Sequence, residues 1–300
     1  MNLYLIASAT DFSLTDTQRR VLESAGNLKV IIHTGRLSDI GALLEDAEEK
    51  VIGIDPDVVG WNLDFEDLGK IKNIKAICTQ STSFGWLQPE ELQKMGIRAC
   101  CVPSYSSDSV AEYVFALALE TARRLPLHLK NMSLDWKTRP LQLKGKILGV
   151  IGLGSIGTHI AEIGQGFGME VRYWSRKSRD ARFVYCELDE LFSHADVLIP
   201  SLKDSEETKL LITHERIDAL KPTAIVVGIG KVKELFDEPY VISRVEQGLL
   251  GGYGFEGDNA KDVHSTANVW GVPPIAWYTT DSLTNLVEGW VHSVIDAAKM

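Results

Sequence analysis

Residues 146–157 read KILGVIGLGSIG, and this stretch decides the fold of the larger part of the chain. Its apolar run is typical of a buried parallel strand, and it leads directly into three glycines spaced Gly152-x-Gly154-x-x-Gly157. After a strand, the first glycine permits a tight turn, the second lets a ligand approach the backbone, and the third lets the next helix pack on the strand. The spacing therefore predicts a dinucleotide-binding turn.

The helix after this turn supplies groups that hold a pyrophosphate. We expect it over 158–167, directly after Ser155 and Ile156, which complete the turn with the three glycines. The first N–H groups of a helix have no partner within the helix and carry partial positive charge, so they attract phosphate oxygens. A glycine-rich turn without a ligand is the alternative interpretation.

The segment after the next strand indicates which dinucleotide binds. That strand, expected over 171–174, leads into Ser175, and an NAD-binding domain usually carries Asp or Glu here, about 20 residues beyond the turn. This chain instead has Ser175, Arg176 and Lys177, and hydroxyls and cations suit the 2′-phosphate of NADP(H). With no carboxylate there to repel that phosphate, we expect NADP(H) as the cofactor, with NAD(H) less favoured. A solvated basic loop is the alternative.

Strand-like runs alternate with helical patterns along the whole chain, which predicts an α/β fold with parallel sheets flanked by helices. In the N-terminal part, strands are expected over 3–7, 29–32, 51–54, 76–80 and 97–102, and helices over 15–25, 38–47 and 89–95. Further on, strands are expected over 147–151, 171–174, 197–199, 224–227 and 249–255, followed by an amphipathic helix over 280–298.

A helix between the two series is apolar nearly all round. Residues 103–107 form a break, and Asp108 or Ser109 then caps a helix that runs to about Arg124. Such a helix must be buried on several sides. A core helix explains the pattern, and so does a helix that is shared with a second subunit.

Composition narrows the class of protein. A chain of 300 residues is long enough for two domains, and a net charge of −10 argues against binding to nucleic acid. No apolar run approaches the ~20 residues of a membrane helix, and the N-terminus lacks the basic region of a signal peptide. We therefore expect a cytoplasmic protein without a membrane partner. The four cysteines, at 78, 100, 101 and 186, lack metal-ligand spacing, so we expect reduced core thiols and no metal site.

Four motifs carry a resemblance to a known family. They are DSVAE at 108–112, the stretch 143–157, Glu207-Thr208 with 220–222, and IAWYT at 275–279. On these residues, and over nearly its whole length, the chain resembles the D-2-hydroxyacid dehydrogenase family, which includes phosphoglycerate dehydrogenase, hydroxypyruvate and glyoxylate reductases, and formate dehydrogenase.

The resemblance implies two Rossmann-like domains. A flavodoxin-like substrate domain covers 1–103 and is completed by 276–300, and a doubly wound dinucleotide-binding domain is inserted over 104–275. It also implies a catalytic cleft at the domain junction and a small anionic substrate. Family members are commonly dimers built on the inserted domain, so we expect a homodimer.

The catalytic residues of the family are replaced in this chain. The family needs an Arg that binds the substrate, a His that moves the proton, and a carboxylate that orients the His. The resemblance places Lys231 at the Arg, Lys261 near the carboxylate and Pro274 at the His. Lysine keeps the charge but loses the bidentate fork, and proline has no ionisable group. We therefore expect a relocated acid/base set, a different reaction or no reaction.

Candidates for a relocated catalytic role are Lys231, His264 and Tyr278, with Glu256 and Asp258 as further carboxylates. Lys231 is favoured, since a cation there binds an anionic substrate, and a desolvated lysine also titrates near neutrality. A solvated loop histidine and a packed tyrosine are the alternatives for the other two.

The substrate-binding loop is expected at Ser81, Thr82 and Ser83, where backbone N–H groups and hydroxyls meet the substrate carboxylate in the family. Phe84 and Trp86, which follow, either line the cleft or pack at the domain junction.

Three functional hypotheses result. The first is an NADP(H)-dependent oxidoreductase that transfers hydride to a small carbonyl or 2-keto acid compound with an altered acid/base set. The second is a catalytically inactive cofactor-binding protein that senses redox state or acts through a protein partner. The third is a structural dimer, and the phosphate-binding turn argues against it because a scaffold has no need of phosphate recognition.

Overall fold

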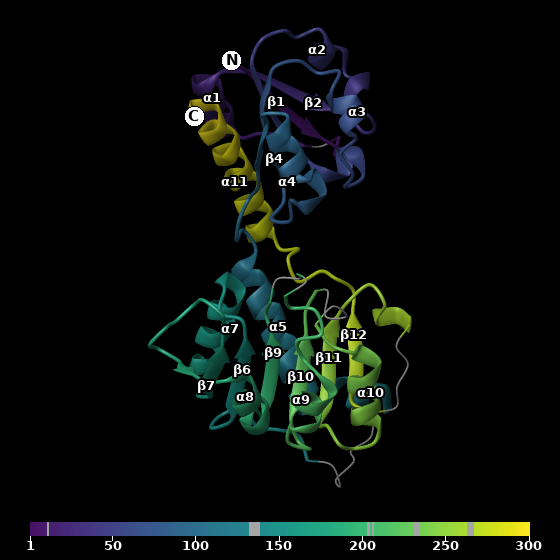
Figure 1. The fold of residues 1–300 in the computed structure, drawn as a ribbon. Coiled ribbons are helices and arrows are strands. Elements are labelled where there is room, and N and C mark those ends of the chain that lie inside the picture. Colours follow the sequence, from purple (N-terminus) through teal and green to yellow (C-terminus); the bar gives the residue numbers. More distant parts are fainter. Residues whose placement is uncertain (11, 132–138, 203–204, 206, 231–234, 263–266) are drawn as a thin grey trace. The chain divides into compact units, whose positions relative to one another are not determined.

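The computed structural model describes residues 1–10, 12–131, 139–202, 205, 207–230, 235–262 and 267–300. The chain forms two compact units, Met1–Ser106 with Thr280–Met300 (unit 1) and Ser107–Thr279 (unit 2) (Figure 1). Each unit is built on a parallel sheet with helices on both faces, which confirms the α/β fold expected from the alternating pattern. None of the helices that the structure describes has the length and apolar character needed to cross a membrane.

Unit 1 has a five-stranded sheet in the order β2-β1-β3-β4-β5, which is the flavodoxin-like order. Its strands are β1 Asn2–Ala7, β2 Asn27–Ile32, β3 Lys50–Ile54, β4 Ile74–Thr79 and β5 Arg98–Cys100. Its helices are α1 Asp16–Ala25, α2 Gly41–Leu44, α3 Phe65–Leu68, α4 Pro89–Lys94 and α11 Thr280–Lys299, with 3₁₀ turns η1 Leu37–Asp39, η2 Pro56–Val59 and η3 Gly85–Leu87.

The last helix of the chain completes the core of unit 1. Side chains alternate between the two faces of a strand, so Leu3 and Leu5 of β1 pack with α11, while Tyr4 and Ile6 join a separate apolar cluster on the other face. Trp290 of α11 is fully buried, and its Nε1 donates to Cys78 O at 2.8 Å.

Unit 2 has a seven-stranded sheet in the order β12-β11-β10-β9-β6-β7-β8, which is the doubly wound Rossmann order with one added strand. Its strands are β6 Ile147–Ile151, β7 Glu170–Trp174, β8 Val184–Tyr185, β9 Val197–Pro200, β10 Ile225–Gly228, β11 Gly252–Glu256 and β12 Val269–Val272. Its helices are α5 Ser107–Arg123, α6 Leu125–Asn131, α7 Ser155–Gly166, α8 Leu188–His194, α9 His214–Asp218 and α10 Glu238–Glu246, with the 3₁₀ turn η5 Ala260–Asp262. The strand order reverses between β6 and β9, which is where such sheets bind ligands.

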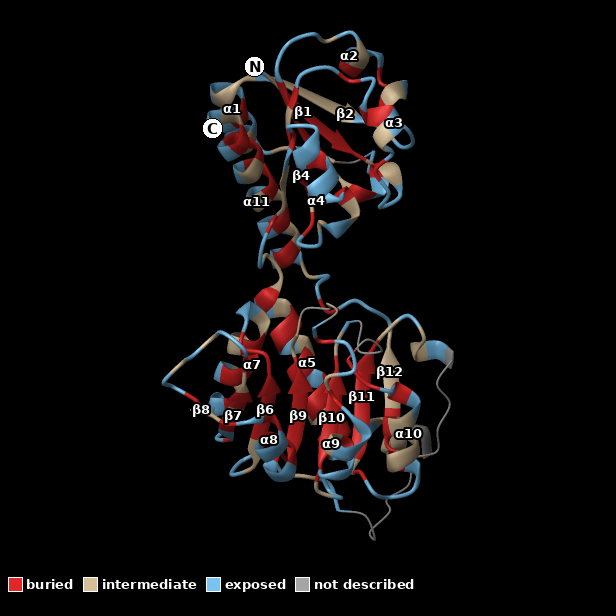
Figure 2. Ribbon diagram, viewed as in Figure 1, coloured by how far each residue is buried: buried red, intermediate tan, exposed pale blue. Residues whose placement is uncertain are grey.

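Helix α5 is a core helix of unit 2. It packs on α7, β10 and β11, and it buries Val110, Val114 and Leu117 among other side chains (Figure 2). Contacts within unit 2 therefore bury much of the apolar surface of α5. The helix begins at Ser107, which puts its N-cap position at Ser106, so the expectation of a cap at Asp108 or Ser109 was wrong by two or three residues.

Three expected elements are clearly shorter than predicted. The helix expected over 38–47 is reduced to η1 and α2, because Ile40 between them adopts an extended conformation (φ −87°, ψ 92°) that interrupts the helix. The strand expected over 249–255 begins at Gly252, where its pairing with Ile225 of β10 begins. The strand expected over 97–102 is reduced to β5 Arg98–Cys100.

Candidate cofactor-binding and active site

The turn after β6 depends on its glycines. Gly152 has a φ of +96°, and a Cβ there would lie 2.5 Å from Ser201 O. A Cβ at Gly157 would overlap Gly152 O, so the helix lies directly on the turn. A Cβ at Gly154 meets no atom of the described residues within 4 Å. The turn thus presents bare backbone to an open surface, which fits a pyrophosphate group.

Helix α7 begins at Ser155, three residues earlier than expected. Ser155 and Ile156 therefore belong to its first turn, where backbone N–H groups point out of the helix end. The Ser155 hydroxyl lies 2.8 Å from that of Ser107, and the Ile156 side chain packs against the core of unit 2. These side chains place the helix end, and the N–H groups are what it offers to a phosphate.

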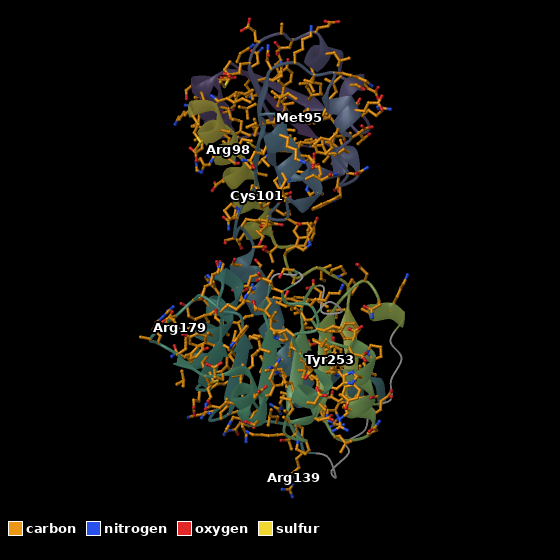
Figure 3. All side chains as sticks on the ribbon, viewed as in Figure 1. Met95, Arg98, Cys101, Arg139, Arg179 and Tyr253 are labelled. Carbon is orange, nitrogen blue, oxygen red and sulfur yellow. The ribbon has the colours of Figure 1, made fainter. Side chains whose placement is uncertain are left out.

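The segment after β7 encloses a buried serine among cations. The Ser175 hydroxyl accepts from the Ser178 N–H at 3.3 Å, and Arg179 Nη1 donates to Ser175 O at 2.7 Å. Arg176 and Lys177 are exposed beside it. Arg179 also stacks 4.0 Å from the Tyr185 ring centroid, and Figure 3 labels it at the edge of unit 2 (Figure 3). The predicted cofactor residues did not include Arg179, although the sequence has a run of three cations at 176–179 that could have indicated it.

The structure corrects one part of the NADP argument. We expected no carboxylate near Ser175, but Glu207 forms an ion pair with Arg176. Both side chains are well exposed, so the pair is weak, and solvent screens it. Sequence reasoning missed this contact because Glu207 comes from a different loop, after β9.

Glu256, at the end of β11, lies close to two segments that carry the positions matched to the family's catalytic residues. Its carboxylate accepts the Ala276 N–H at 2.8 Å, and Ala276 lies two residues after Pro274. The side chain is buried, and burial raises the pKa of Glu256, although the backbone N–H groups of Ala276, Ile275 and Gly230 oppose the shift. Gly230 directly precedes Lys231. We infer that the Glu256 carboxylate helps to position the backbone at 275–276.

Replacing Glu256 with glutamine is expected to leave the free energy of unfolding at low pH close to that of the wild type, because the neutral amide keeps an oxygen that can accept the Ala276 N–H. The raised pKa means that the folded state holds the proton more tightly than the unfolded state. The protonated Glu256 carboxyl therefore contributes its full share to the free energy of unfolding below about pH 4.5, and this share is lost as the pH rises through the pKa of the folded state. Urea unfolding between pH 4 and about 8 tests this sign. The variant should lose this part of the slope, the exposed Glu90→Gln should keep it, and identical curves for wild type and Glu256→Gln would refute the assignment.

Of the remaining predicted catalytic positions, some are described and exposed, and others lie outside the described residues. Lys231 and His264 lie outside the described residues. Tyr278 is 63% exposed, so it is not packed in a core as one alternative had it, and its ring lies edge-on to Trp277 at 5.2 Å. Lys261, in η5, and Pro274, after β12, are both exposed. The described residues contain no group of three or more His, Cys, Asp or Glu suited to hold a metal.

The loop predicted to bind substrate follows β4 in unit 1. Ser81 donates its hydroxyl to Ser83 O at 2.7 Å, and Thr82 donates its hydroxyl to Val102 O at 2.7 Å. These side chains hold the shape of the loop, whereas Ser83 is exposed. Phe84 and Trp86 are partly buried and pack against the apolar core of unit 1.

Comparison with known proteins places this architecture in a family. The model of the D-isomer specific 2-hydroxyacid dehydrogenase NAD-binding domain matches residues 115–276. The chain is similar to the glyoxylate reductases of Pyrococcus furiosus (29% identity, 69% of this chain and 67% of that one) and Thermococcus onnurineus (30%, 69% and 67%). This chain belongs to the D-2-hydroxyacid dehydrogenase family, and its unit 2 carries that family's NAD-binding domain.

Solved structures of the same fold differ in their cofactor. A D-lactate dehydrogenase from Aquifex aeolicus, in complex with NAD and lactic acid, is 26% identical, with a TM-score of 0.71 over 97% of this chain and 93% of that one. An acyclic imino acid reductase, in complex with NADPH and D-Arg, is 21% identical, with a TM-score of 0.76 over 97% and 95%, and shares the fold.

Proposed function

We propose that this protein is an NADP(H)-dependent oxidoreductase that acts on a small anionic carbonyl or 2-keto acid compound with an altered acid/base set. The observation that carries the proposal is the open, glycine-lined turn at the N-terminus of α7, with cations beside Ser175. When bound, the nicotinamide supplies or accepts the hydride. The chain's own part is to hold the phosphates, bind the substrate and move the proton.

The preference for NADP(H) rests on Arg176, Lys177 and Arg179. Their exposed side chains follow Ser175 in the same segment, and Arg179 donates to the Ser175 carbonyl. The Ser175 hydroxyl accepts from the Ser178 N–H and can itself donate to a phosphate oxygen. Arg176 already pairs with Glu207, so a 2′-phosphate must compete with that carboxylate. Two further cations remain in the run, which favours binding of the phosphate.

The double variant Arg176→Ser, Lys177→Ser is expected to weaken NADPH binding about 10- to 100-fold. This is the effect of losing about one charge-assisted bond of roughly 1.5–3 kcal/mol, because Arg176 already pairs with Glu207 and gains less from the phosphate. NADH affinity should change by less than about threefold, because NADH lacks the phosphate that these cations meet. Titration by reduced-nicotinamide fluorescence measures both. Arg139→Ser is the matched control, because Arg139 lies well away from Arg179 in the same unit (Figure 3). Equal losses for the two cofactors would contradict the preference.

For the substrate, we propose Lys231 as the cation that binds it, with His264 and Tyr278 as further candidates for the proton transfer. Ser81, Thr82 and Ser83 would contact its carboxylate, mainly through backbone N–H groups, because two of the hydroxyls already bond within unit 1.

The test is a cofactor titration followed by a substrate screen. NADPH and NADH are titrated first, and glyoxylate, hydroxypyruvate and pyruvate are then added at saturating cofactor while absorbance is followed. Tight NADPH binding with oxidation by one of these acids supports the proposal. Failure to bind either dinucleotide would overturn the assignment of the turn.

The second candidate is a cofactor-binding protein without turnover, which acts as a redox sensor or through a protein partner. Pro274 favours it, because proline cannot replace the proton-transferring histidine. Dinucleotide binding without turnover on any small carbonyl compound would support it. A homodimer and a cytoplasmic location are part of both proposals, and light scattering on purified protein tests the first of these.

A further inference from the structure

Unit 1 contains a groove of about 550 Å³ between the chain segment 98–105 and α11. Cys100 and Cys101 line one side, and His292 and Asp296 of α11 line the other. Figure 3 labels Arg98 and Cys101 beside α11. We expected all four cysteines in the core, but Cys100 and Cys101 are only partly buried because β5 is the edge strand of its sheet.

Cys100 lies opposite a second thiol. In the parallel pairing of β4 with β5, Cys78 and Cys100 are register partners, and both belong to the apolar cluster beneath α11. Neighbouring strands lie about 4.8 Å apart, and disulfides span Cα separations of about 4.4–6.8 Å. Cys78 is buried and its thiol lies 3.5 Å from Ser293 O, whereas Cys100 borders the groove. One thiol of the pair is therefore open to a small reagent and the other is not.

The surroundings of Cys100 favour its thiolate. The Cys78 side chain and the positive charge of Arg98 lower the pKa of Cys100 below the usual value of a cysteine thiol, although burial and the nearby Asp296 oppose this shift. The Cys100 side chain and burial raise the pKa of Cys78. The other ionisable side chains that line the groove are Cys101, Tyr105 and His292. Thiolates are the reactive form of cysteine, so Cys100 is the reactive member of the pair.

We propose that Cys100 is a modification site at which a hydroperoxide oxidises the thiol, and that Cys78 then closes a reversible disulfide with it. The Cys100 thiolate attacks a peroxide oxygen, so a sulfur–oxygen bond forms and the oxygen–oxygen bond breaks. The leaving oxygen takes up a proton and departs as water or an alcohol. The Cys78 sulfur then attacks the sulfenic acid, its proton leaves with the hydroxide as water, and the sulfur–sulfur bond forms. Two thiols lose two electrons and the peroxide gains them.

The chain provides a matched control for this chemistry. Cys101 follows Cys100, is also partly buried and lines the same groove, but it has no place opposite Cys78 in the strand pairing. A general exposure of this edge would make both thiols react alike. The proposed pair requires Cys100 alone to be linked to Cys78.

The test treats the full chain with equimolar hydrogen peroxide, followed by peptide mapping with and without a thiol reductant. The expected product is a Cys78–Cys100 disulfide that the reductant removes, and Cys101→Ser should give the same product. Cys78→Ser should instead accumulate sulfenic acid on Cys100, trapped by dimedone. In the untreated protein, iodoacetamide should label Cys100 with a midpoint below the pH of about 8.5 that is usual for a cysteine thiol, and Arg98→Met should raise that midpoint. A Cys100–Cys101 bond, or oxidation and labelling of Cys101 as fast as Cys100 in the wild type, would overturn the proposal.

Discussion

Gly157→Ala is expected to lower dinucleotide affinity by at least about 100-fold, because the loss of two charge-assisted bonds to phosphate, each worth about 1.5–3 kcal/mol, has that effect. The added Cβ would overlap Gly152 O, which is backbone and cannot rotate away. Either α7 moves off the turn or the turn opens. In both cases the N–H groups at the start of α7 leave the place where they meet the pyrophosphate.

The same substitution is expected to cost about 1–3 kcal/mol of stability, which is usual for overpacking in a well-packed region. Gly166→Ala is the matched control, since it lies at the end of the same helix and its Cβ would meet no atom within 4 Å in the part of the chain that the structure describes. It should bind NADPH as the wild type does. Fluorescence titration measures affinity and circular dichroism confirms folding; a folded Gly157→Ala with wild-type affinity would show that the turn does not hold the cofactor.

Lys231→Met is expected to reduce kcat by at least about 100-fold on whichever substrate the screen identifies, a loss typical of removing one group that stabilises charge in the transition state. Lys231 itself lies outside the described residues, so its role stays a proposal. It follows Gly230 in the sequence, and β10, which ends at Gly228, runs parallel to β6 with its glycine turn. The proposal is that a cation after β10 binds an anionic substrate.

The measurement for Lys231→Met separates binding of cofactor from turnover. NADPH affinity should stay within about twofold of wild type, since the phosphate contacts at the start of α7 are untouched. Lys94→Met, an exposed lysine on α4 that pairs with Glu91, controls for the loss of one positive charge. Unchanged turnover in Lys231→Met would remove Lys231 from the proposed site and leave His264 and Tyr278 as the candidates.

Local sequence predicted those elements whose own pattern carries the signal. The apolar run at 147–151 became β6, and the last amphipathic pattern became α11. Missed elements were those with weak local signals: β12 has four residues, including Trp270 and Gly271, and forms only because β11 offers a parallel partner. Helix α6 was also missed, and it carries Pro126 in its first turn, where proline is tolerated.

The candidate site divides in the same way. The spacing of Gly152, Gly154 and Gly157 predicts the geometry of the cofactor-binding turn, because each glycine is needed for a contact within one strand–turn–helix unit. No such pattern predicts that Glu207 pairs with Arg176, or that Glu256 accepts the Ala276 N–H. These contacts connect segments that are distant in the chain, and their distances arise only when the sheet assembles.

By itself, the sequence determined the α/β class and the dinucleotide-type turn, since these depend on residue identity and short-range spacing. Only the tertiary structure decided that the Glu256 carboxylate is buried among backbone N–H groups and that Cys78 and Cys100 are paired across two strands. The physical reason is that burial and electrostatic environment depend on which strands become neighbours, and strand order is a property of the assembled sheet.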